Sequence, residues 1–268
     1  MLSSMGFYLR LLCSDALELI RPRVCASCGA YGTKAVNRSL CSHCDFQVRH
    51  SLLNVHCSRV DGVGCPIYSA GAYEHELARS ILAYKNHSRT DLLDILATGL
   101  VRAVVECLQQ AEDVKRIVLI PMPSDPSATR RRGYVPAQLL AERVCRLMGE
   151  YAGVSCVSYG LLSKKKRWGR GDKSGQKLLT GAQRRQRLSH SMRLSSPPLS
   201  FMGFYYDVRG VHCLLVDDVL TTGATLAEGY RVISSAGGKV IGAVTVAYVP
   251  YRGGTSTYTV GYPPISLD

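Results

Sequence analysis

The sequence lacks any window of about 18 uninterrupted apolar residues, the length that a membrane-spanning helix needs. The stretch from Gly6 to Ile20 is interrupted by Arg10, Asp15 and Glu18, which is not typical of the apolar region of a secretory signal peptide. Its apolar residues fall near helical spacing, so we expect an amphipathic helix that docks on the rest of the chain, with a membrane-surface anchor as the alternative. These features predict a soluble cytoplasmic protein.

Acidic residues are also scarce, because 20 Asp and Glu stand against 33 Lys and Arg and the net charge is +13. Most of the excess is local: the segment 164–187 contains ten basic residues and one acidic residue. Such a segment suits polyphosphate or nucleic acid, and the alternative is a solvated loop without a partner. Trp168, which lies inside the segment, could stack on a base of single-stranded DNA.

The cysteines do not form the pattern of a disulfide framework, because their number, eleven, is odd and only four of them are regularly spaced. These four form two Cys-x-x-Cys pairs, Cys25 with Cys28 and Cys41 with Cys44, and they predict a tetrahedral zinc site. Four sulfur ligands leave no open position for water, so we expect a structural zinc ion. His43 could replace one sulfur, although a residue inside the second pair is more often a bystander.

The order of the remaining patterns predicts two domains. Residues 1–65 are expected to hold the N-terminal helix and the zinc module, and residues 66–268 an α/β domain. Apolar spacing in the second part predicts helices within 77–108 and over 136–148 and 224–236, and strands over 116–120, 154–162, 211–216 and 240–249. Strand, helix and strand in succession make a βαβ unit, so we expect an open, mostly parallel, twisted sheet with helices on both faces.

The segment from Cys213 to Thr225 combines a buried strand, two adjacent acids and a Thr-Thr-Gly-x-Thr sequence at the start of a helix. Hydroxyl groups, a flexible glycine and the positive end of a helix together suit a phosphate monoester. Asp217 and Asp218 are natural acceptors for the vicinal hydroxyls of a pentose. A helix capped by threonine after an ordinary strand is the alternative, but it leaves the two acids unexplained.

The same segment resembles the phosphoribosyl pyrophosphate signature of type I phosphoribosyltransferases. By this resemblance Asp217 and Asp218 hold the ribose hydroxyls, and magnesium accompanies the pyrophosphate. The resemblance assigns the 5′-phosphate to Thr221, Thr222, Gly223, Ala224 and Thr225.

A four-cysteine module in front of this signature is similar to the ComF family of competence-associated, phosphoribosyltransferase-like proteins. The motif Ile120-Pro-Met-Pro123 and the Arg132-Gly-Tyr134 sequence add to the resemblance. It implies a type I phosphoribosyltransferase-like fold behind the zinc module. Arg132 and Lys85 are our candidates for contact with pyrophosphate. Together with Asp217 and Asp218 they make up the candidate catalytic residues.

The function implied is transfer of a phosphoribosyl group from phosphoribosyl pyrophosphate to a nitrogenous base. Family members usually carry Asn-Gln where this chain has Val135-Pro136, so turnover is left open. The alternative is a non-catalytic protein that binds phosphoribosyl pyrophosphate or handles single-stranded DNA with competence proteins. The acceptor base and the oligomeric state are not determined by the sequence.

Overall fold

The computed structural model describes residues 24–31, 39–111, 114–151, 155–165, 190–195, 207–250 and 257–260. The helix expected near the N-terminus, most of the basic segment with Trp168, and most of the tail lie outside these residues. The described helices and strands are, in chain order, α2 (Ser42–Ser51), β1 (Val55–Ser58), β2 (Ile67–Ser69), α3 (His75–Asn86), the 3-10 helix η1 (Thr90–Leu92), α4 (Leu93–Gln109), β3 (Arg116–Pro121), α5 (Pro126–Arg132), α6 (Pro136–Tyr151), β4 (Ser155–Ser158), β5 (Leu162–Lys164), β6 (Met192–Leu194), β7 (His212–Leu220), α8 (Ala224–Ser235), β8 (Lys239–Tyr248) and β9 (Thr257–Val260).

Most strands belong to one seven-stranded sheet, in the order β4-β3-β7-β8-β2-β1-β9. The five strands from β4 to β2 in this order run parallel, while β1 pairs antiparallel with both β2 and β9. β5 and β6 form a separate antiparallel pair. The prediction of a mostly parallel sheet is therefore confirmed.

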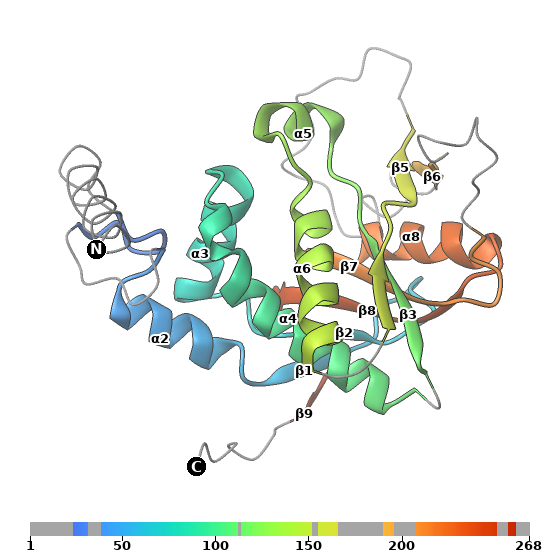
Figure 1. The fold of residues 1–268 in the computed structure, drawn as a ribbon, viewed down its shortest axis with the longest axis horizontal. Helices are drawn as coiled ribbons and strands as arrows, with labels where there is room; N and C mark the ends of the chain where they lie inside the picture. The colour runs from blue at the N-terminus through green and yellow to red at the C-terminus, as the bar shows by residue number, and fades with distance from the viewer. Residues whose placement is uncertain are drawn as a thin grey trace, which may run out of the picture.

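Apolar cores cover both faces of the sheet. Leu214 and Val216 of β7 belong to one buried cluster, and Cys213 and Leu215 belong to the other, as the alternation of side chains along a strand requires. The first cluster includes residues of α2, α3, α4 and α6, and the second includes residues of α8, β5 and β6. In Figure 1, α3, α4 and α6 are grouped together, and α8 lies apart from them beside β5 and β6.

The expected strand 154–162 is wrong as a single element. The chain pairs with β3 along β4 and then turns, with the Leu161 amide donating to the Tyr159 carbonyl oxygen at 2.9 Å, before β5 begins at Leu162. β7 differs in the opposite sense, because it continues beyond the expected end at Val216 and includes both acids. The sequence pattern missed this extension because the acids interrupt the apolar run.

The division of the chain at residue 65 stays a prediction, and β1, on the N-terminal side of it, pairs within the main sheet. In the cysteine module, α2 begins directly after Cys41 and contains Cys44. Within the described residues, no helix is long and apolar enough to cross a membrane.

Candidate functional site: a phosphate-type loop at the end of β7

The turn between β7 and α8 lies at the carboxyl end of the parallel strands, where open α/β sheets bind ligands. Three residues, from Thr221 to Gly223, connect the strand to the helix. Thr221 is exposed and Thr222 and Thr225 are partly exposed, so their hydroxyls can reach a ligand. No side chain of the described residues caps the start of α8, whose first N–H groups have no partner within the helix. The turn can therefore offer both hydroxyl and amide donors to an anion.

Gly223 fixes the shape of this turn. It has φ +70°, the left-handed conformation that glycine adopts without strain, and it is the N-cap residue of α8. A Cβ atom at this position would lie 2.7 Å from Cγ1 of Val60. Any larger residue would therefore move either the turn or the segment that carries Val60.

The acid pair of β7 meets a lysine from α3. Lys85 Nζ lies 2.5 Å from Asp218 Oδ2, and Asp218 is buried with 7% of its side chain exposed, whereas 40% of the Lys85 side chain is exposed. Burial opposes the charge of Lys85, but the Asp218 carboxylate outweighs it and the pKa of Lys85 is raised. The second Asp218 oxygen accepts from the Val219 amide at 2.9 Å. Asp218 is thus held as an ion-paired carboxylate.

Asp217 is in a different electrostatic state. Its Oδ1 accepts from the Asp218 amide at 2.9 Å. Burial, together with the neighbouring Asp218 charge, raises the pKa of Asp217 to about 8, and Lys85 offsets only part of this. The pair therefore presents one acid that holds a proton near neutral pH beside one that pairs with Lys85. A pentose with two vicinal hydroxyls can find both an acceptor and a donor there.

Arg132 and Tyr134 reach the same place from the segment between β3 and α6. Arg132 donates from Nη1 to the Lys85 carbonyl oxygen at 2.9 Å, and its buried Nε has no hydrogen-bond partner among the described residues. Tyr134 donates to the Tyr84 carbonyl oxygen at 2.5 Å, and Tyr84 donates to the Pro136 carbonyl oxygen at 2.9 Å. The end of α3 is thus tied to the start of α6 beside the acid pair.

These contacts place Lys85, Arg132 and the two acids together, as the sequence grouped them. Arg130 and Arg131 are exposed and take no part in the contacts around Lys85. The contact of Pro136 with Tyr84 uses a backbone carbonyl, so it does not depend on the amide side chains that Val135-Pro136 replaces. The hydrogen-bonding role of Tyr84 and Tyr134 was not predicted from the sequence.

A cleft of about 450 Å³ is lined by residues on either side of Arg132 in the sequence, among them Arg130 and Val135. It lies between the segment after β3, the start of α6 and the connection from β4 to β5. Arg130 and Lys164 supply positive charge, and Met122, Val135 and Leu162 supply apolar surface. A cleft with this lining suits a ligand that combines a flat apolar part with negative charge.

The two ends of the basic segment are attached to one another and to α8. β5 and β6, which flank residues 165–191, pair with one another. Buried Glu228 of α8 accepts from the Met192 amide at 3.0 Å and from Arg231 at 2.8 Å. Burial alone would raise the pKa of Glu228, but these donors outweigh it and the pKa is lowered. The hairpin base is therefore fixed to the helix whose N-terminus follows the phosphate-type turn.

The four patterned cysteines come together at the N-terminal end of the fold. Their sulfur atoms all lie within 4.8 Å of one another, and three of the four residues are buried. Cys28 and Cys41 have sulfurs 3.9 Å apart, close to the edge of about 3.8 Å in a tetrahedron with zinc–sulfur bonds of about 2.3 Å. His43 is exposed and does not belong to the cluster. The donor set therefore fits a closed tetrahedral metal site.

The backbone around the cluster favours ionised sulfur at one position. Burial opposes ionisation of Cys25, but hydrogen bonds from backbone amides, including that of Cys41 at 3.4 Å, outweigh burial and lower the pKa of Cys25 to about 6. Burial raises the pKa of Cys44. A bound metal ion would stabilise all four thiolates, because metal ligation requires deprotonated sulfur.

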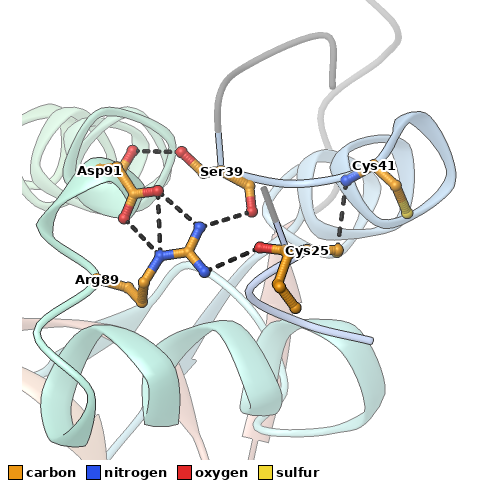
Figure 2. A network of polar contacts seen from close by, with 6 residues as sticks. Cys25, Ser39, Cys41, Arg89 and Asp91 are labelled. Carbon is orange, nitrogen blue, oxygen red and sulfur yellow. Dashed lines mark hydrogen bonds and ion pairs between the residues drawn. The ribbon is translucent and has the colours of Figure 1, made fainter. Parts of the chain in front are cut away.

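Arg89 ties the cysteine module to the helices of the main domain (Figure 2). Its guanidinium donates to the carbonyl oxygens of Val24 and Ser39, at 3.0 and 3.2 Å, and pairs with Asp91 at 2.8 Å. Ser39 in turn donates to the Asp91 carbonyl oxygen at 2.8 Å. Arg89 follows α3, the helix that carries Lys85, so one short segment contacts both the metal module and the acid pair. No motif in the sequence indicated this arginine.

The comparisons with known proteins agree with this arrangement. Residues 130–260 match the family model described as the phosphoribosyl transferase domain. This part of the chain, just under half of its length, is similar to that domain. The matched region includes β7, the phosphate-type turn and α8.

Two relatives span most of the chain. The chain is 26% identical to the DNA utilization protein YhgH of Salmonella typhimurium over 220 residues, which are 81% of this chain and 86% of that protein. It is likewise 26% identical over 225 residues to the protein of the same name from Salmonella typhi. The adenine phosphoribosyltransferase of Nocardia farcinica is 37% identical over 65 residues, 24% of this chain and 34% of that enzyme. The phosphoribosyl transferase domain and the four-cysteine cluster together confirm the resemblance to the ComF family.

Proposed function

We propose that the chain binds phosphoribosyl pyrophosphate with magnesium at the carboxyl end of β7 and transfers the phosphoribosyl group to a nitrogenous base in the cytoplasm. The observation that carries this proposal is the single turn that joins the acid pair to an uncapped helix start through a left-handed glycine. In this assignment Asp217 and Asp218 hold the ribose hydroxyls. The 5′-phosphate is held by the loop Thr221, Thr222, Gly223, Ala224 and Thr225.

In the proposed reaction the acceptor nitrogen forms a bond to the anomeric carbon as the bond from that carbon to pyrophosphate breaks. Magnesium would supply positive charge to the pyrophosphate when it is bound. Arg132 and Lys85 lie where they can add to this charge, because the Arg132 guanidinium contacts the Lys85 backbone and the Lys85 ammonium contacts Asp218. Catalysis would then rest on positioning and on charge stabilisation of the leaving group.

Zinc is proposed as the ion of the four-cysteine site, held by Cys25, Cys28, Cys41 and Cys44. Four thiolates without an open position give the ion a structural role. The test is metal analysis of the purified chain, for which we expect one zinc ion per chain and loss of that ion in a Cys28→Ser variant. Retention of zinc in this variant would contradict the assignment of Cys28 as a zinc ligand.

The ligand assignment is tested by calorimetric titration of phosphoribosyl pyrophosphate with magnesium into an Asp217→Ala, Asp218→Ala double variant. We expect at least a tenfold loss of affinity relative to the unmodified chain. Asp94→Ala is a matched control, because this acid is 73% exposed and pairs with Arg143, away from the acid pair of β7. Unchanged affinity in the double variant, with folding verified by circular dichroism, would overturn the assignment.

Transfer itself needs a separate experiment, because the Val135-Pro136 sequence departs from the family. Release of pyrophosphate is measured with a panel of purine and pyrimidine bases. Base-dependent release is expected for a transferase. If phosphoribosyl pyrophosphate binds tightly but no base causes release of pyrophosphate, the chain is a binding protein and the transfer proposal is wrong.

A second candidate function is a non-catalytic protein that binds phosphoribosyl pyrophosphate and handles single-stranded DNA together with competence proteins. It is favoured by the name of the Salmonella relatives, which are DNA utilization proteins, and by the excess of basic residues in 164–187. DNA bound by that segment should dissociate steeply as salt rises, and neutralising residues 164–167 should weaken binding. Binding that is insensitive to salt and to these substitutions would exclude this reading.

A further inference from the structure

A pair of cysteines lies outside both the metal cluster and the phosphate-type site. Cys145 projects from α6, and Cys156 lies in β4, the strand at one edge of the seven-stranded sheet. Their sulfur atoms are 2.7 Å apart. A disulfide has a sulfur–sulfur bond of about 2.05 Å, so a further approach of about 0.7 Å would suffice to form it. The backbone already holds the two thiols at nearly bonding distance.

Both cysteines can be reached by a small reagent. Each is partly exposed, although both pack against the apolar core under α6. They are eleven positions apart in the sequence, and one belongs to a helix and the other to the adjoining strand. A bond between them would join two elements and would not simply close a turn within one element.

We propose that Cys145 and Cys156 are a redox modification site, at which a hydroperoxide converts the two thiols into a reversible intramolecular disulfide. This site is independent of the proposed phosphoribosyl transfer. The resting protein keeps both thiols reduced, as the sequence predicts for a cytoplasmic chain. In such a compartment the bond would be transient, because thiol reductants restore the dithiol.

The reaction balances with the peroxide as the sole oxidant. The Cys156 sulfur attacks one oxygen of hydrogen peroxide, the oxygen–oxygen bond breaks, and the departing hydroxide takes up the proton of the Cys156 thiol to give water. Cys145 sulfur then attacks the sulfenic acid at Cys156, the sulfur–oxygen bond breaks, and the Cys145 proton leaves with the hydroxyl as a second water. The two sulfurs together lose two electrons, which the peroxide gains.

The order of the two steps follows from the surroundings of the pair. The hydrogen bond with Cys156, together with burial and the nearby Glu142, raises the pKa of Cys145, so this thiol keeps its proton. In the proposed order Cys156 meets the oxidant first, and Cys145 resolves the sulfenic acid. The titratable and charged neighbours identified around the pair are Glu142 on α6 and the two thiols themselves.

The bond would have a mechanical consequence for the cleft between the segment after β3, the start of α6 and the connection from β4 to β5. The start of α6 carries Val135 and Gln138 at one wall of the cleft, and the chain that leaves β4 carries Gly160 and Leu162 at another. Because Cys145 lies in α6 and Cys156 lies in β4, the disulfide would tie the helix that begins at one wall to the strand that leads into the other.

The test uses the full-length chain with its metal bound, treated with hydrogen peroxide and then with an alkylating reagent. Peptide mass spectrometry should find a Cys145–Cys156 cross-linked peptide that is two hydrogens lighter than the reduced peptides and that disappears with dithiothreitol. The melting temperature should rise by roughly 3–10 °C on oxidation, since the bond closes a short loop. Zinc release is followed in parallel, and none is expected at the same dose.

Cys145→Ser and Cys156→Ala should each abolish the cross-link and the rise in melting temperature, while their reduced forms melt near the reduced parent. Cys57→Ser is the matched control, because Cys57 is also partly exposed but lies on β1. This variant should behave like the parent. Full alkylation of both cysteines after peroxide, or a cross-link that persists in either variant, would overturn the proposal.

Discussion

The ion pair between Lys85 and Asp218 should be the most sensitive polar contact of the site. Lys85→Met removes the positively charged partner of a carboxylate whose side chain is 7% exposed, and leaves its hydrogen bond from the Val219 amide in place. Breaking a fully buried pair costs about 3–5 kcal/mol. Because 40% of the Lys85 side chain is exposed and water screens the pair, we expect a loss of about 1–3 kcal/mol in the free energy of unfolding.

The assay is urea unfolding in a double-mutant cycle with Asp218→Asn. The double variant should regain most of the stability lost in Lys85→Met, with a coupling energy of about 1 kcal/mol or more, because no unpaired charge remains. Arg143→Met is the control, since its partner Asp94 is 73% exposed and the pair should contribute less than about 1 kcal/mol. If the two effects add without coupling, the buried ion pair does not hold Asp218 as described.

Three further perturbations test other parts of the site. Arg89→Met should weaken the attachment of the metal module and raise the rate of zinc capture by a chelator roughly tenfold. Arg49→Met, which breaks an ion pair within α2, should leave this rate unchanged. Equal rates in the two variants would contradict the role of Arg89. The Asp217 pKa of about 8 lies above the value of about 3.9 of an unfolded chain, so the free energy of unfolding should fall as pH rises from about 4 to 8. Asp217→Asn should remove this part of the pH dependence, as measured by denaturation at several pH values. An unchanged pH dependence would contradict the raised pKa. Gly223→Ala should lower the free energy of unfolding by about 1–3 kcal/mol, with a lower melting temperature. Adding Val60→Ala should restore the part of this loss that comes from overlap with Val60, but not the part that comes from the left-handed backbone.

The sequence predicted the scaffold well where apolar periodicity and turn residues agree. The structure contains the predicted helix around Tyr84, the helix after Pro136 and the strand that ends at Pro121. It also contains the predicted βαβ unit, in which the helix ends before Gly237. The spacing of four cysteines predicted their convergence, because metal ligation needs only that spacing and a short loop.

The contacts that organise the site were not predictable, because they join residues far apart in the chain. Arg89 binds the carbonyl oxygens of Val24 and Ser39, and backbone carbonyls leave no trace in a sequence pattern. Lys85 was a candidate for pyrophosphate, but its contact with Asp218 depends on the docking of α3 at the end of β7. The states of the two acids likewise depend on burial, which the two adjacent letters in the sequence cannot distinguish.

The most direct measurement is a calorimetric titration of the metal-loaded chain with phosphoribosyl pyrophosphate and magnesium, compared with a Thr222→Val variant. Thr222 lies in the turn before α8 and is partly exposed, so its loss should remove one phosphate donor with little effect on the fold. We predict saturable binding of one ligand per chain, competed by ribose 5-phosphate, and an affinity about tenfold lower in the variant. Absence of binding at millimolar ligand, or equal affinity in the two proteins, would contradict the assignment of the turn between β7 and α8 as the phosphoribosyl site.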